Sequence, residues 1–553
     1  MSGEQLRTTE VDGVPVYWLP GPGTLRANLW FRAGMADEPL PTHGWLHLLE
    51  HLALHGRHSI RTPVNGQVSL LHTAFDVEGE PDDVVAHLRD LCRWLSQPAF
   101  SDLDHERRVL RAESSRRGGN PVGSHLLWRY GARGVGLAEY DEFGLHTAQP
   151  DGLRELAARA YARGNAVLAL SGPPPAGLEL PLPPGPRMIP ARSVQCEQPL
   201  PGGFAGRPDA IALSGTAARS TAASAMLRAF ERGLQGGLRH DSGVGYSAWS
   251  SYEVVDADRA MLTVGMDVIP EALRDAVSES IAILRRLRDR GPDPVELRDD
   301  LDAQIRQFGT RPAHQWLPIL AARDALLGTP VTNSVEELSA ETDAVTVAQV
   351  REVALSVWRD LLVSVDPKAG GDPQLTWLDS PPAVVKPSDG RRFRPIHPEH
   401  KGALTVGATG VHLETADGRA SAAYDEVAGM VRYPDGGRQL IQHDGYGAQV
   451  EPTLWRHGSQ AVALIDAAIP PALHIRLPER TKDQIPYVKV RRIDTVRGWL
   501  NKPVVWVPFL VLVILGVVLT TAPDEIASIV GRVIPIGIAI GVVTFFRQLR
   551  SKK

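Results

Sequence analysis

The sequence ends in two long apolar segments. Residues 503–521, PVVWVPFLVLVILGVVLTT, carry no charge and are long enough to cross a bilayer as a helix. A second apolar run, residues 533–546, follows Arg532, which would have to snorkel or face its neighbour helix. The link between the two runs includes APDE and is too short for anything but a hairpin. We therefore expect residues 503–546 to form a transmembrane helical hairpin rather than a buried hairpin of a soluble domain.

The charges around these apolar runs predict how the hairpin is oriented. Lysines and arginines lie before it and after it, whereas Asp524 and Glu525 lie in the link. The positive-inside rule then places both chain ends and all soluble domains in the cytoplasm, as expected for a multi-pass protein of the cell membrane. The start, MSGEQLRTTEVDG, has no signal-peptide pattern, and only two cysteines occur, which fits a reducing compartment. The net charge of -5 gives no reason to expect nucleic acid.

A chain of 553 residues is too long for a single core, and its patterning changes along its length. The first part alternates strand-like runs such as VPVYWL and NAVLALSG with helical ones, as in α/β or α+β domains. Residues 400–475 show short β-like runs between glycines, which predicts a small sandwich or barrel; a lipid-facing or partner-facing role and a plain spacer are both open for it. The expected fold class is α+β, with a first α/β domain at 1–175, a Pro-rich linker at 176–198, a second α/β domain at 199–370, a linker at 371–399, the β-rich domain at 400–475, a basic juxtamembrane segment at 476–502 and the hairpin at 503–546.

The second α/β domain repeats the first in outline. VAHLRDLCRWLSQPAFSDLDHERRVLRAE is echoed by ESIAILRRLRDRGPDPVELRDDLDAQ, each as a helix, a Pro-containing break and a charged helix. In this register Glu106 falls opposite Glu296, whereas Glu113 falls opposite Ala303. The segment AMLRAFERGL, which has no histidine, takes the place of a His-rich helix of the first domain. We therefore expect a duplicated unit in which only the first copy carries ligand-type residues.

The His-rich helix reads HGWLHLLEHLALHG, with four histidines spaced four apart on one helical face. A hydrolytic zinc site needs two close imidazoles and a carboxylate that reaches the attacking water without being a ligand. His47, Glu50 and His51 provide this set as HxxEH, the reverse of the commoner HExxH. The leucines around them predict a buried helix, in which such polar groups need partners. Because a catalytic zinc takes three protein ligands, we expect His43 and His55 to pack or hydrogen-bond at the helix ends.

A third ligand is available on the downstream helix DHERRVLRAE. Its Glu106 and Glu113 lie two turns apart on one face, enough for one metal ligand and one residue that orients a ligand. Together with RAGMADEP and HLLEHLALHG, this helix resembles the N-terminal half of the M16 metallopeptidases, the inverted zincins that include pitrilysin, insulin-degrading enzyme and mitochondrial processing peptidase. The resemblance covers about residues 10–370 and implies zinc bound by His47, His51 and Glu113, with Glu50 as the base and Glu106 one step behind the metal. The interval from His51 to Glu113 is shorter than usual for the family, so Glu106 is an alternative third ligand.

A second motif, GGLRHDSGVGYSAWSSY, looks like the family's motif in which an arginine and a tyrosine reach the substrate. Arg239 and Tyr246 would then stabilise the oxyanion of a tetrahedral intermediate. In contrast, VSLLHTAFDVEG lacks the Asn-Ala pair often found on the family's substrate-holding edge strand. Family members enclose their substrate in a chamber of four such units and this chain has two, so the resemblance implies a homodimer or an M16-like partner subunit.

These motifs lead to one expected function and one alternative. The expectation is a membrane-anchored zinc metalloendopeptidase that hydrolyses peptides or unfolded segments with a Glu-activated, zinc-bound water. The alternative is a non-catalytic, membrane-tethered scaffold or assembly module. Inert relatives tend to lose the HxxEH histidines, and both histidines are present in this chain.

Overall fold

The structure is a computed structural model that describes residues 5–57, 62–114, 120–190, 192–241, 243–369, 375–378, 389–397, 402–415 and 418–487. The expected transmembrane hairpin at 503–546 lies outside these residues, as does most of the juxtamembrane segment at 476–502. Within the described ranges, no helix combines the length and the apolar character needed to cross a bilayer. The chain up to Pro486 forms one compact unit, which contains both α/β domains and the β-rich domain.

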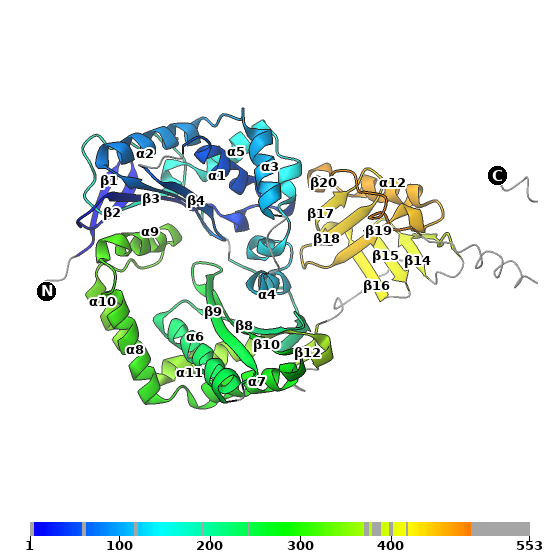
Figure 1. Ribbon diagram of the computed structural model, residues 1–553. Helices are drawn as coiled ribbons and strands as arrows, with labels where there is room; N and C mark the ends of the chain where they lie inside the picture. The colour runs from blue at the N-terminus through cyan, green and yellow to red at the C-terminus, as the bar shows by residue number, and fades with distance from the viewer. Residues whose placement is uncertain are drawn as a thin grey trace, which may run out of the picture. The chain divides into compact units, whose positions relative to one another are not determined.

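The first α/β domain is built on a six-stranded sheet (Figure 1). One face packs against α1 (Trp45–Leu54), α2 (Pro81–Ser96) and α5 (Pro150–Ala160), and α3 (Leu103–Ser114) lies beside α1. Valine and leucines recur along α2 at helical spacing, so this helix buries one continuous apolar stripe. In sheet order, the strands are β1 (Arg7–Val11), β2 (Val14–Trp18), β6 (Ala166–Leu170), β3 (Leu25–Phe31), β5 (Thr73–Gly79) and β4 (Val64–Val68).

The second sheet repeats the connectivity of the first. The parallel pair β2/β6 of the first sheet corresponds to the parallel pair β7/β11 of the second, and the three pairs that follow in each sheet are antiparallel. Only the first pair differs, because β1/β2 is antiparallel and β12/β7 is parallel. Helix α6 (Thr221–Leu234) follows β8 as α1 follows β3, so AMLRAFERGL does occupy the place of the His-rich helix. The expected duplication is therefore present in the fold. In sheet order, the strands are β12 (Thr376–Trp377), β7 (Gly202–Ala205), β11 (Leu362–Val365), β8 (Ala210–Ala218), β10 (Arg259–Val268) and β9 (Gly245–Val254); α7 (Leu273–Arg290), α8 (Pro294–Phe308), α10 (Val335–Asp343) and α11 (Val347–Arg359) complete this half.

One helix from each half of this duplication packs against the sheet of the other half. Helix α4 (Pro121–Tyr130) packs on the second sheet, where His125 Nδ1 lies 2.7 Å from Ser214 Oγ and His125 Nε2 lies 3.1 Å from Ser364 Oγ. The buried Arg129 of α4 forms an ion pair with Asp360, with 2.6 Å between Nη1 and Oδ1. In return, α9 (Leu317–Leu327) covers the face of the first sheet opposite α1. This exchange fixes the two halves to each other by buried polar and apolar contacts.

The β-rich domain consists of two four-stranded sheets and helix α12 (Gly458–Ala468) around a separate core. A small β domain was expected, but the boundaries of the preceding linker at 371–399 were wrong. Strand β12 extends the second sheet with the partly buried Trp377, and β13 opens the β domain with the buried Phe393. The Pro-rich composition concealed both short strands. The sheets run β13 (Arg391–Phe393), β14 (Ala403–Val406), β15 (Gly410–Thr415), β16 (Gly418–Ala423), and β19 (Gly447–Val450), β18 (Arg438–Gln442), β17 (Val427–Arg432), β20 (His474–Arg476).

Candidate metal centre

Helix α1 presents one apolar face and one polar face. It starts after Gly44, whose φ of 97° is in the left-handed region, and its leucines are buried in the core of the first domain. Glu38, from the RAGMADEP segment, accepts hydrogen bonds from the backbone N–H groups of Gly44 (2.9 Å) and Leu46 (2.7 Å). Glu38 also lies 3.3 Å from Nδ1 of His43, so His43 contacts the carboxylate that caps the start of the helix, as expected. RAGMADEP therefore fixes where α1 begins.

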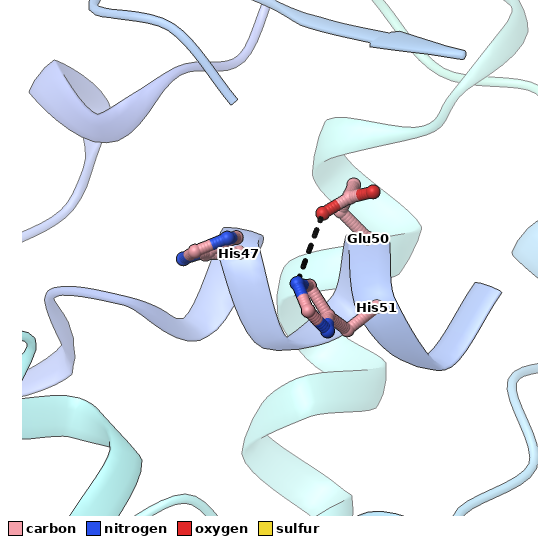
Figure 2. Close-up of side chains that lie close together, drawn as sticks. All are labelled: His47, Glu50 and His51. Carbon is pink, nitrogen blue, oxygen red and sulfur yellow. Dashed lines mark ion pairs between the residues drawn. The ribbon is translucent and has the colours of Figure 1, made fainter. Parts of the chain in front are cut away.

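The face of α1 that points away from its buried leucines carries His47, Glu50 and His51 close together (Figure 2). The two imidazole rings are nearly perpendicular, with 5.0 Å between their centroids. Glu50 Oε2 lies 3.9 Å from His51 Nε2, the ion pair drawn in Figure 2. Each of the three residues offers one ligand-type atom within 4.8 Å of the others. The two histidines of HxxEH are thus close enough to share a single metal ion, with Glu50 beside them.

Both histidines are oriented by a carboxylate at the ring nitrogen Nδ1. Glu106 Oε2 lies 3.1 Å from Nδ1 of His51, and Glu142 Oε1 lies 2.7 Å from Nδ1 of His47. A carboxylate only accepts hydrogen bonds, so each Nδ1 carries the proton and the lone pair is left on Nε2. This arrangement is typical of metal-binding histidines, whose second nitrogen donates to a carboxylate. Glu142 was missed in the sequence because it lies in a turn 95 positions from His47 and belongs to no periodic pattern.

Glu106 and Glu113 lie on different sides of His51. Glu106 is buried and contacts Nδ1, whereas Glu113 Oε2 lies 3.8 Å from Nε2 and its side chain is 48% exposed. Since Nε2 is the nitrogen with the lone pair, Glu113 is on the metal-facing side and Glu106 is on the orienting side. This geometry favours Glu113 over Glu106 as the candidate third ligand. Two Nε2 atoms and one carboxylate are a donor set that suits a three-ligand zinc site, so the residues fit this metal.

Glu50 is enclosed between α1 and the edge strand β4. Only 5% of Glu50 is exposed, and a Cβ at Gly66 of β4 would overlap its Oε1. Burial raises the pKa of Glu50, and the neighbouring His51 and His47 oppose this rise. A raised pKa brings a carboxylate closer to the range useful for a general base. An alanine at position 66 would therefore displace the Glu50 side chain.

The edge strand of the first sheet is not the one expected from the sequence. VSLLHTAFDVEG was interpreted as one strand, but Val68 ends β4 and β5 begins only at Thr73, after a turn. The edge strand is VNGQV, which contains Asn65-Gly66 and no Asn-Ala pair. Asn, Gly and Gln have low or neutral strand propensity, so the pattern did not reveal this strand. Residues 65–68 of β4, together with α1, α3 and Glu142, line a cavity of about 740 Å³ around the histidines.

Arg239 and Tyr246 lie close to each other but do not line this cavity. Arg239 is in a π-helical turn, Gln235–Asp241, and Tyr246 follows at the start of β9. Both are exposed, Tyr246 to 77%, and the guanidinium carbon lies 5.9 Å from the centre of the phenol ring. The structure therefore brings this motif together as a pair, separately from the histidine pair of the same chain.

Comparisons with known proteins agree with this architecture. No protein-family model matches the sequence, and no curated protein sequence matches it. Among solved structures, a peptidase M16 inactive domain from Pseudomonas fluorescens is similar (TM-score 0.53, 16% identity), and the match covers 65% of this chain and 98% of the Pseudomonas chain. A putative M16-like peptidase from Alicyclobacillus acidocaldarius (TM-score 0.53, 16% identity) covers 66% and 99%. Pitrilysin (TM-score 0.50, 16% identity) matches 66% of this chain with 45% of its own. The expected resemblance is confirmed in the fold: about two thirds of this chain adopts the mixed α/β fold of the M16 peptidases.

Proposed function

We propose that this chain is a zinc metalloendopeptidase, anchored in the cell membrane by its C-terminal hairpin. The observation that carries the proposal is the set of four carboxylates around the histidine pair of α1. Glu106 and Glu142 suffice to satisfy the two half-buried histidines, yet Glu50 and Glu113 lie on the other side of His51, toward Nε2. Glu50 is buried, and a further carboxylate at this place would be unfavourable in a purely structural core, because buried charges need partners.

The proposed roles follow from position. Zinc bound by His47, His51 and Glu113 would supply a Lewis acid that acidifies water and polarises a carbonyl. Glu50 is a neighbour of these ligands with a raised pKa, so it is placed to take the proton from the attacking water. The edge strand β4 beside Glu50 offers backbone groups that an extended peptide can pair with, which favours peptides or unfolded segments as substrates.

Arg239 and Tyr246 would act in an assembly of two copies or with an M16-like partner subunit. In one chain they do not line the histidine cavity, so a second subunit would have to bring them to it. The lengths of the matched structures support such an assembly. A share of 66% of this chain matches all of a protease from Helicobacter pylori (TM-score 0.53, 14% identity), and an equal share matches only 45% of pitrilysin. Two copies of this chain would thus provide as many α/β units as the longer protein.

The decisive experiment measures zinc content and hydrolysis of a quenched peptide library by the full chain in detergent. We expect the wild type to bind zinc and cleave, and Glu50→Gln to bind zinc but lose cleavage. Wild-type chain that holds zinc without Glu50-dependent cleavage would contradict the peptidase and favour the non-catalytic scaffold, which the match to an M16 inactive domain keeps open.

The proposed topology is tested separately. A reporter fused to the C-terminus should be found in the cytoplasm, together with the soluble domains. A reporter found on the other side of the membrane would contradict this orientation and leave the metal centre unaffected.

A further inference from the structure

We propose that this chain has a second site for a divalent transition metal ion, next to the zinc site and formed by His55, His105, Glu106 and Asp102. His55, His105 and Glu106 each offer one ligand-type atom within 4.8 Å of the others. Asp102 Oδ1 lies 3.7 Å from His55 Nε2, so a second carboxylate is within reach of the same group. From the sequence alone, His55 was expected only to pack or hydrogen-bond at the end of α1.

The positions of these residues on their helices explain why they converge. Asp102, His105 and Glu106 lie at i, i+3 and i+4 at the start of α3, a spacing that places side chains on one face of a helix. His55 is the C-cap of α1, the helix beside α3, and its ring lies 5.5 Å from that of His105. His55 also lines the zinc cavity, so the second site lies at the rim of that cavity. His105 is exposed and has room to turn toward an ion.

The donor set defines the class of ion. Two imidazoles with carboxylates suit zinc, copper, nickel or cobalt, whereas magnesium and calcium prefer sites made of oxygen ligands alone. In a tetrahedral zinc site neighbouring ligand atoms are about 3.3 Å apart, given bonds of about 2.0 Å. A mutual separation within 4.8 Å therefore needs rotations of the two histidines, whose side chains are exposed. His55 would exchange its present 2.5 Å hydrogen bond to Glu106 Oε1 for the shared ion. Because of this exposure, we expect the second site to bind more weakly than the first.

Glu106 connects the two sites. Its Oε2 lies 3.1 Å from Nδ1 of His51, a proposed zinc ligand, and its Oε1 lies 2.5 Å from Nδ1 of His55. An ion bound at Oε1 would draw charge from the carboxylate and weaken it as the acceptor for His51. A carboxylate that accepts a hydrogen bond from a metal-binding histidine makes that histidine more basic, so weakening this hydrogen bond weakens metal binding and activity. We therefore expect the second ion to inhibit, and this part of the inference rests on the proposed peptidase function.

The experiment counts metal ions first, without reference to activity. The untagged, metal-free full chain in detergent is titrated with Co²⁺, whose visible absorption reports bound ions. We expect two equivalents for wild type and one equivalent for each of the variants His105→Ala and His55→Asn. His457→Asn is the matched control, because His457 is an exposed histidine of the β domain whose φ of 60° asparagine tolerates. A wild type that saturates at one equivalent, or His105→Ala that still takes two, would overturn the second site.

Activity is measured second, with zinc in place of cobalt. Raising zinc from one to two equivalents should lower the hydrolysis of a peptide severalfold in wild type and leave the rate of His105→Ala at its one-equivalent value. A wild-type rate that does not change as the second ion binds would overturn the connection through Glu106. A chain that binds two ions and cleaves nothing would contradict the peptidase but support the second site. The two failures can therefore be told apart.

Discussion

Replacing Glu142 by glutamine should weaken zinc binding about 10- to 100-fold, or about 1.4–2.7 kcal/mol. Glu142 Oε1 lies 2.7 Å from Nδ1 of His47, and the two side chains are only 8% and 15% exposed. Water is therefore poorly placed to replace a lost acceptor. Glutamine keeps the shape but removes the charge that makes this hydrogen bond strong and Nε2 of His47 more basic. The effect should appear in metal affinity rather than in the folding of the first domain.

The assay is a competition for zinc between the full chain and a chromophoric chelator, with circular dichroism as a check of folding. Glu139→Gln is the matched control, since Glu139 is in the same segment and contacts Ser124 at 3.1 Å, but lies outside the histidine cavity. We expect Glu139→Gln to bind zinc as the wild type does. An unchanged zinc affinity in Glu142→Gln, or an equal loss in both variants, would refute the orienting role of Glu142.

Three further predictions concern the base, the support of the site and the interface of the two halves. Gly66→Ala should push Glu50 away, because the added Cβ overlaps Oε1, and should lower hydrolysis about 100-fold while the zinc content stays that of the wild type; an unchanged rate would be incompatible with Glu50 as the base. Phe143→Ala should lower the free energy of unfolding by about 3 kcal/mol in a denaturant titration, since this ring is buried between the first domain and the β domain; a change below about 1 kcal/mol would show that this contact is unimportant. Burial lowers the pKa of His125 to about 3 from its usual 6.5, so the unfolded chain takes up a proton below pH 6.5 that the folded chain does not. Stability should therefore fall as pH decreases from 6.5 toward 3, by up to about 1.4 kcal/mol per pH unit from this residue, and thermal unfolding at pH 7 and pH 5 should show a smaller shift in His125→Gln than in wild type.

Local patterns in the sequence identified the parts of the site that one helix supplies. His47, Glu50 and His51 share a helical face by spacing alone, and the structure does bring them together. Glu106 and Glu113 were found as a pair on one helix, but only the tertiary contacts separate the glutamate at Nδ1 from the one at Nε2. The sequence therefore indicated the candidate ligands and left their arrangement open.

Contacts between distant segments could not be predicted in this way. Glu142 contacts His47 from a turn, and its neighbours in sequence show no helix or strand period that would mark it. The edge strand VNGQV forms because it pairs with β5 and leaves room for Glu50, which outweighs its low strand propensity. The exchange of α4 and α9 between the two sheets also depends on tertiary packing, since neither helix carries a sequence pattern that assigns it to one sheet or the other.

The contacts of the β domain with the first domain argue against one of the alternatives that the sequence left open for it, the plain spacer. A plain spacer would need no apolar contact with the first domain, yet Leu40 and Phe143 are buried in one cluster with Val431 and Ile475 of the β domain. Leu40 belongs to the 3-10 helix Leu40–Thr42 just before α1, and Phe143 directly follows Glu142 in sequence. These two contacts support the start of the helix that carries both histidines and the carboxylate that orients one of them. A displacement of the β domain would therefore reach His47 through Glu142, so this domain is part of the framework of the metal centre.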